Sequence, residues 1–145
     1  MTIAMSPLER EAFLAGVHVG VLSVDDPGHA PLTVPVWYAY EAGGTVDVVT
    51  RRENLKARRL RAAGRGSLCV QNETPPYGYV SVEGPVTEIV DPVLPESPRA
   101  MAYRYLGPEF GELYLAATKD DAPNSVMFRL APERWRTADF AKQYG

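Results

Sequence analysis

Residues 46–71 run VDVVTRRENLKARRLRAAGRGSLCVQ, and this stretch decides the fold. Its first five residues are mostly β-branched and predict a strand. From residue 54 to about residue 63 the apolar residues recur at helical spacing, and Gly64 is placed to end that helix. Apolar residues return over 67–71, which predicts another strand. The stretch is therefore a strand, a basic helix and a strand.

Working outward, valine-rich and alternating segments predict five further strands, at residues 17–24, 32–40, 79–90, 124–130 and 134–138. Pro35 lies inside the second of these, and because proline cannot donate to the ladder we expect an edge strand or a bulge there. Six or seven strands with few helices predict a mainly β, α+β domain over residues 1–145, with the sheet closed into a barrel.

Helices are predicted at the two remaining places. Ser6, Pro7 and Glu9 match a capping box with proline at the first helical position, and Gly16 can end that helix. Residues 91–98 contain three prolines and predict a loop. A helix follows over 99–106, closed by Gly107 and Pro108, and another runs through Ala117.

Composition excludes several classes of protein. The single cysteine, Cys69, rules out an intrachain disulfide, and no apolar stretch is long enough to span a membrane. The first residues do not resemble a signal peptide, so we expect a cytoplasmic protein. We find no metal-binding, nucleophile-elbow or Walker motif. Reactive chemistry, if the protein is an enzyme, is then expected to come from a cofactor.

The charge is uneven along the chain. Residues 51–65 hold seven basic residues and one acid, a net charge of +6, whereas the rest of the chain carries −9. Such a local excess indicates an anionic partner. Nucleic-acid-binding proteins spread positive potential over a broad surface, so a small polyanion fits this pattern better.

The strand-to-helix junction at residues 50–56 predicts where that anion binds. A helix N-terminus offers unpaired N–H groups, to which Thr50 adds a hydroxyl, Arg52 a planar fork of donors and Lys56 a point charge. Arg59 falls in the same helical arc as Leu60, whereas Arg58 and Arg61 lie opposite and are expected to be solvated. The alternative interpretation is a solvated basic helix face.

Four segments carry a resemblance to a known family: PLTVPVWY at 31–38, TRR with KAR within 50–58, SLCV at 67–70 and PPYGYVSVEG at 75–84. In this order and spacing the chain resembles the pyridoxamine 5′-phosphate oxidase-like proteins, and within them the flavin and deazaflavin oxidoreductase branch. The resemblance implies a six- or seven-stranded split β-barrel of the FMN-binding-protein type with a few peripheral helices.

The same resemblance implies a homodimer with two cofactor sites between the subunits. The cofactor ring would lie against the backbone of Val34, Pro35, Val36 and Trp37. The phosphate would meet Thr50, Arg52 and Lys56, with Arg51 nearby and Arg59 as a further candidate. Tyr77 and Tyr79 would come from, or near, the opposite subunit, with Tyr77 placed to stack on a ring.

Members of the family use coenzyme F420, FMN, FAD or heme. Coenzyme F420 carries a phosphate and an oligoglutamate tail, and the +6 segment exceeds what one phosphate requires, so we expect F420 with FMN as the alternative. The expected activity is hydride transfer between reduced F420 and a small electron-poor substrate. Two alternatives stay open: an FMN-dependent enzyme acting like pyridoxamine-phosphate oxidase, and a deazaflavin carrier without turnover. No residue stands out as the general acid, and nothing predicts which substrate binds.

Overall fold

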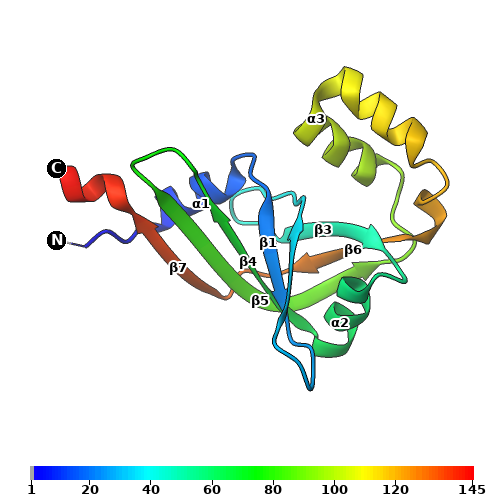
Figure 1. Ribbon diagram of the computed structural model, residues 1–145, viewed down its shortest axis with the longest axis horizontal. Coiled ribbons are helices and arrows are strands. Elements are labelled where there is room, and N and C mark those ends of the chain that lie inside the picture. Colours follow the sequence, from blue (N-terminus) through cyan, green and yellow to red (C-terminus); the bar gives the residue numbers. More distant parts are fainter. Residues whose placement is uncertain (1) are drawn as a thin grey trace.

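A computed structural model, which describes residues 2–145, contains one curled antiparallel sheet of seven strands (Figure 1). The strand order is β2-β1-β4-β5-β6-β3, and β7 pairs with β5 beside this path. The strands are β1 (Gly20–Val24), β2 (Leu32–Val36), β3 (Val46–Arg51), β4 (Arg65–Gln71), β5 (Gly78–Val90), β6 (Ser125–Leu130) and β7 (Arg134–Asp139). The predicted mainly β fold with a split barrel is confirmed.

The long strand β5 organises the barrel. One of its edges pairs with β4, while the other pairs first with β7 and then with β6, with a register shift between Val86 and Glu88. Gly84 allows the link from β6 to β7 to approach, because a Cβ atom there would lie 1.7 Å from the Ala131 carbonyl oxygen. An isolated bridge between Ala39 and Asp47 brings the chain after β2 against β3 and closes the curl.

Inward-facing residues of these strands form the core. Leu22, Val48, Val80, Val126 and Phe128 are completely buried. Leu22, Val48 and Val80 alternate with exposed or half-buried residues, as expected for strands with one face toward an apolar interior. In β6, Met127 between Val126 and Phe128 is buried as well. Two helices contribute Leu14, Ala57 and Leu60 to the same cluster.

Helix α1 (Pro7–Ala15) has the predicted capping box, with both reciprocal hydrogen bonds between Ser6 and Glu9. Helix α2 (Leu55–Ala63) ends where Gly64 takes a left-handed conformation, φ 69°. Helix α3 (Glu96–Ala117) consists of two halves that meet at the non-helical Gly107, φ 80°, so the predicted break is confirmed. Short 3-10 turns, η1 (Ala122–Asn124) and η2 (Phe140–Tyr144), precede β6 and follow β7.

Two predictions of element bounds need correction, those of the first two strands and that of the start of α3. The first two strands are shorter than the predicted 17–24 and 32–40, because a side chain described below occupies the backbone groups that would extend them. At Pro35 the edge strand is confirmed and the alternative, a bulge, does not form, because β2 lies at the sheet edge and its register with β1 is regular. Helix α3 begins at Glu96, since Pro98 lies in the first turn, where a proline N–H is not needed.

The helices are distributed unevenly around the sheet. Both chain ends, α1 and β7 lie at one end of the molecule, whereas α2 and α3 lie at the other (Figure 1). Helix α3 belongs to an insertion, residues 91–124, that leaves the sheet after β5 and returns at the neighbouring strand β6. Within residues 2–145 no helix is long and apolar enough to cross a bilayer.

Candidate ligand-binding cleft

Two adjoining cavities lie between the barrel and α3. The larger, about 680 Å³, has β3 and the start of α2 on one side and both halves of α3 on the other. The smaller, about 300 Å³, is lined by Val19, Pro35, Val36, Trp37, Val49, Lys56 and Tyr114. Val49, Lys56 and Tyr114 line both, so the two cavities form one cleft. Its size falls in the range of small-molecule sites.

Thr50 and Asn54 shape the cleft where β3 leads into α2. Thr50 ends the buried part of β3, and its hydroxyl accepts a hydrogen bond from the Asn54 side-chain amide at 3.1 Å. Asn54 occupies the N-cap of α2 but makes no side-chain capping bond to the helix. The first-turn N–H groups of α2 therefore have no side-chain cap and can serve an anion.

Lys56 lies at the junction of the two cavities. Its side chain is half-buried, and burial lowers the pKa of its ammonium group because a charged form is poorly solvated there. Among the residues that the structure describes, none forms a hydrogen bond or ion pair with it. A partly desolvated cation without a partner favours an anionic ligand.

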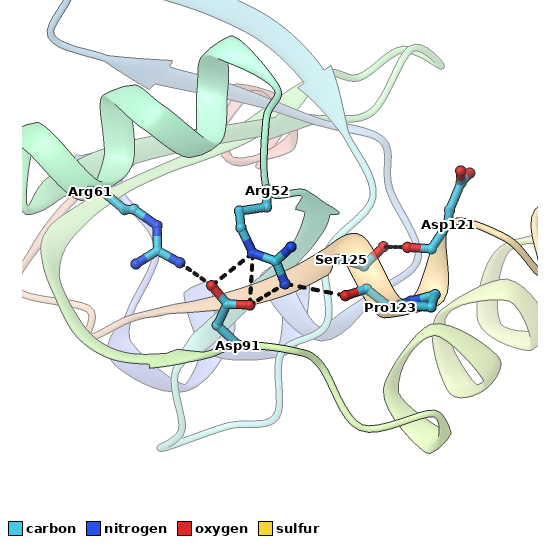
Figure 2. A network of polar contacts seen from close by, with 6 residues as sticks. All are labelled: Arg52, Arg61, Asp91, Asp121, Pro123 and Ser125. Atoms are coloured by element: carbon cyan, nitrogen blue, oxygen red, sulfur yellow. Dashed lines mark hydrogen bonds and ion pairs between the residues drawn. The ribbon is translucent and has the colours of Figure 1, made fainter.

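Arg52 does not line the cleft. Its guanidinium forms a fork with the Asp91 carboxylate, with Nε 3.0 Å from both oxygens, and it also donates to the Pro123 carbonyl at 3.2 Å (Figure 2). Arg61 donates to the same carboxylate at 2.6 Å. Arg61 is thus not simply solvated, which corrects the sequence interpretation. The two arginines hold the pKa of Asp91 below its usual value, chiefly through the Arg52 hydrogen bond.

Pairing also reduces the charge of the basic segment. Arg51 lines the larger cavity but pairs with Glu53 at 2.8 Å, and Arg65 pairs with Glu133 at 2.8 Å. Arg59 lies outside the lining of both cavities, and its Nε is buried without a hydrogen-bond partner in the described chain. The net +6 seen in the sequence therefore overstates the charge that a ligand would meet.

Tyr105 and Tyr114 of α3, which were missed at the sequence level, pack on Trp37 beside the cleft. The Trp37 ring stacks on Tyr105 with centroids 4.9 Å apart and meets Tyr114 at 5.2 Å. The Tyr105 hydroxyl accepts from the Tyr38 N–H at 3.0 Å and donates to the His18 carbonyl at 2.6 Å. His18 and Tyr38 would pair if the β1–β2 ladder continued, so the Tyr105 hydroxyl explains why β1 begins late and β2 ends early.

The other predicted site residues lie in two different places. Pro35, Val36 and Trp37 line the smaller cavity, whereas Val34 packs against the core. Tyr77 and Tyr79 do not line this cleft; with Phe140 they border a separate pocket at the end of the molecule that holds both termini. Within one chain the structure thus brings six of the eleven predicted residues together: Pro35, Val36, Trp37, Thr50, Arg51 and Lys56.

The sequence of residues 7–139 matches the family described as pyridoxamine 5′-phosphate oxidase. The chain belongs to this family. No curated protein sequence matches it significantly. The match covers the barrel, the cleft and the α3 insertion together, so the two walls of the cleft are parts of one family domain.

Several solved structures share this fold. A conserved hypothetical protein, Rv2991 from Mycobacterium tuberculosis, is 28% identical with a TM-score of 0.76, over 99% of this chain and 90% of that one. An F420 reductase is 20% identical with a TM-score of 0.64, over 87% and 94%. An FAD-binding protein from Mesorhizobium loti is 22% identical with a TM-score of 0.66, over 92% and 94%.

Proposed function

We propose that this protein is an oxidoreductase that binds coenzyme F420 in the cleft and transfers hydride between the cofactor and a small electron-poor organic substrate. The observation that carries the proposal is Lys56, a half-buried cation without a partner in residues 2–145, beside the uncapped start of α2. Membership in a family with flavin-type cofactors and the fold shared with an F420 reductase support it.

The residues of the cleft fit a phosphorylated ring cofactor. Thr50, Lys56 and the first turn of α2 supply hydroxyl, ammonium and N–H donors at one point, as a phosphate requires. The apolar side chains of Val19, Pro35 and Val49 line the adjoining smaller cavity, which suits a flat, weakly polar ring. The ring and the phosphate would then occupy the two joined cavities.

The far end of the larger cavity favours F420 over FMN. Arg99 on α3 and Lys119, two residues after α3, line this cavity together with the acidic Glu96 and Asp121. Arg99 is paired with Glu112, whereas Lys119 has no ionic partner within the described chain. FMN ends at its phosphate and would leave this end empty, but the carboxylates of an F420 tail would reach a cation there. The preference for F420 therefore rests on Lys119 in the larger cavity. It no longer rests on the net charge of residues 51–65, because several basic residues of that segment form ion pairs within the chain.

When bound, such a cofactor supplies the hydride chemistry, and the protein's part is to bind, orient and shield it. Trp37 and Tyr114, which line the smaller cavity, pack on each other, and Tyr105 stacks on Trp37; together they would keep water from one side of the cleft. Thr50 and Lys56 would fix the phosphate and thereby the position of the ring. A substrate would approach from the open side of the smaller cavity.

We also propose a homodimer. Val17, Val19 and Val21 expose more than a third of their surface each, and Val19 borders the smaller cavity. An exposed apolar strip of this kind beside a ligand site is typical of an interface. A second copy would cover the strip and could bring Tyr77 or Tyr79 to the ring, which one chain alone does not do.

An absorbance titration with F420, FMN and FAD tests the cofactor assignment. We expect F420 to bind most tightly and its affinity to fall with added salt. Lys56→Ala should weaken binding by about 1–3 kcal/mol, the range for a charged hydrogen bond, whereas Arg58→Ala on the exposed side of α2 should change it little. Binding of FMN without F420 would support the FMN-dependent alternative.

A turnover assay distinguishes the proposed oxidoreductase from the alternative, a deazaflavin carrier without activity. Reduced F420 is incubated with the protein and a panel of quinones, enones and tetrapyrroles, and its oxidation is followed by absorbance. Consumption above the uncatalysed rate supports the oxidoreductase. Tight binding without consumption across the panel would support a carrier instead.

A further inference from the structure

We propose that Arg52, Asp91 and Arg61 form a bracket that sets the position of α3 over the cleft, and that Arg52 is a positioning residue and not a ligand of the phosphate. This inference rests on the proposed function, because it assigns a role to residues that surround the same site. It departs from what the family resemblance implies for Arg52.

Arg52 touches both ends of the α3 insertion. Its backbone N–H donates to the Asn124 carbonyl at 2.7 Å and its guanidinium to the Pro123 carbonyl, both in the returning segment. The same guanidinium grips Asp91, the first residue of the outgoing segment (Figure 2). The two segments also meet directly, since the Val93 N–H donates to the Ser125 carbonyl at 2.9 Å.

Arg61 joins this bracket to the helix that carries Lys56. It donates to Asp91 from α2, at a position about one and a half turns after Lys56. Asp91 therefore connects α2, one wall of the cleft, to the insertion, the other wall. A bidentate pair fixes both distance and orientation, which a single point charge does not.

The second half of α3 depends on this connection more than the first half does. Residues of the first half dock on the barrel through Tyr105 and through Arg104, which donates to the Gly16 carbonyl at 2.9 Å. After Gly107, Tyr114 lies against Trp37, while Phe110 and Leu113 are mostly exposed. The returning segment held by Arg52 thus helps to place Tyr114 and Lys119 opposite Lys56.

The direction in which Asp91→Asn changes the affinity for the cofactor distinguishes a positioning role of Arg52 from direct contact with the phosphate. In the case of direct contact, Arg52 is a phosphate ligand that Asp91 binds in the absence of cofactor. Asp91→Asn would then release the guanidinium and remove a nearby negative charge, so the anion would bind more tightly. If the bracket positions the cleft, Asp91→Asn loosens the insertion and binding weakens. The two roles predict opposite changes in the dissociation constant.

The experiment titrates F420 at fixed ionic strength into the full-length protein and its variants. We expect Asp91→Asn and Arg52→Gln each to weaken binding about two- to thirtyfold, the range for residues that act on a site without touching it. Their double variant should lose no more than the larger single effect. Arg52→Lys should resemble Arg52→Gln, because a point charge cannot replace the fork. Arg61→Gln should give a smaller loss.

Glu53→Gln is the matched control, since it removes a neighbouring negative charge outside the bracket. We expect unchanged or slightly tighter binding from it. Tighter or unchanged F420 binding by Asp91→Asn, or restored binding by Arg52→Lys, would overturn the inference.

Hydrogen exchange without cofactor provides an independent readout. Asp91→Asn should speed amide exchange in residues 91–95 and 118–125, while exchange in β4 and β5 stays as in the unaltered protein. Equal exchange in the two proteins would overturn the bracket even if F420 binds. If the unaltered protein fails to bind F420, the proposed function fails, and the exchange experiment still decides whether the bracket holds the insertion.

Discussion

The barrel and the α3 insertion contain similar kinds of large side chain but hold them in different ways. In the barrel, Phe128 and Leu22 are completely buried, and every strand contributes to one apolar interior. In the insertion, Phe110 and Leu113 are 66% and 63% exposed. The insertion buries Val93, Met101 and Ala102 outside the core cluster, and polar contacts of Arg104, Tyr105 and Asp91 help to fix it to the rest of the chain.

Because of this difference, we expect the barrel to be more stable against unfolding than the insertion. Apolar burial scales with the area removed from water and acts on the barrel as a whole. A hydrogen bond or an exposed ion pair contributes much less, so the insertion is expected to open locally before the barrel unfolds. The proposed ligand site lies between a stable wall and an adjustable one, an arrangement suited to admitting a cofactor and a substrate.

The largest expected effect tests the barrel against the insertion directly. Leu60 is fully buried among the core residues, and Leu60→Ala should lower the free energy of unfolding by about 2–5 kcal/mol. Phe110→Ala removes a larger side chain from α3, yet its effect should stay within about 0.5 kcal/mol. Chemical denaturation followed by circular dichroism measures both. Equal losses would mean that Phe110 is buried in the functional assembly.

A smaller effect is expected where the two regions meet. Tyr105→Phe keeps the stacking on Trp37 but leaves the Tyr38 N–H and the His18 carbonyl without their partner, which should cost about 1–3 kcal/mol. Tyr103→Phe on the same helix removes an exposed hydroxyl that pairs only with its neighbours Arg99 and Glu112 among the described residues, and serves as the control. Denaturation and hydrogen exchange of α3 check the prediction. A larger loss from Tyr103→Phe would contradict it.

The smallest expected effect is a pH dependence of stability that arises from Glu9, at the end of the barrel opposite the insertion. Hydrogen bonds from Lys142 and from the Ser6 backbone lower the pKa of Glu9 from 4.5 to about 2. Because the folded-state pKa is lowered, the stabilisation is complete above pH 4.5 and is lost as the pH falls toward 2. Glu9→Gln should therefore be slightly less stable than the unaltered protein at pH 6, with the difference disappearing by about pH 2. Thermal unfolding across this range measures it, and a difference that grows on acidification would contradict the assignment.

Local sequence signals predicted most of the elements. The Ser6 and Glu9 pair, the Asn54 and Gly64 boundaries and the break at Gly107 act through neighbouring backbone, so their residue types predict the local structure. The edge position of Pro35 follows from its missing N–H. Lys56 was also predicted as a site residue, because its place just inside a helix start follows from the strand-to-helix order.

Long-range partners were decided only in the tertiary structure. Arg52 and Asp91 are 39 positions apart, and no periodicity relates them; they meet because β3 and β5 both border β6. Tyr105 lies in a helix that the sequence predicted, but nothing in the sequence indicated that its hydroxyl would end the β1–β2 ladder. From residue type and spacing one can predict local backbone conformation and which face of a helix or strand is apolar. Which charge meets which carboxylate depends on how strands distant in sequence pair, and only the folded chain contains that information.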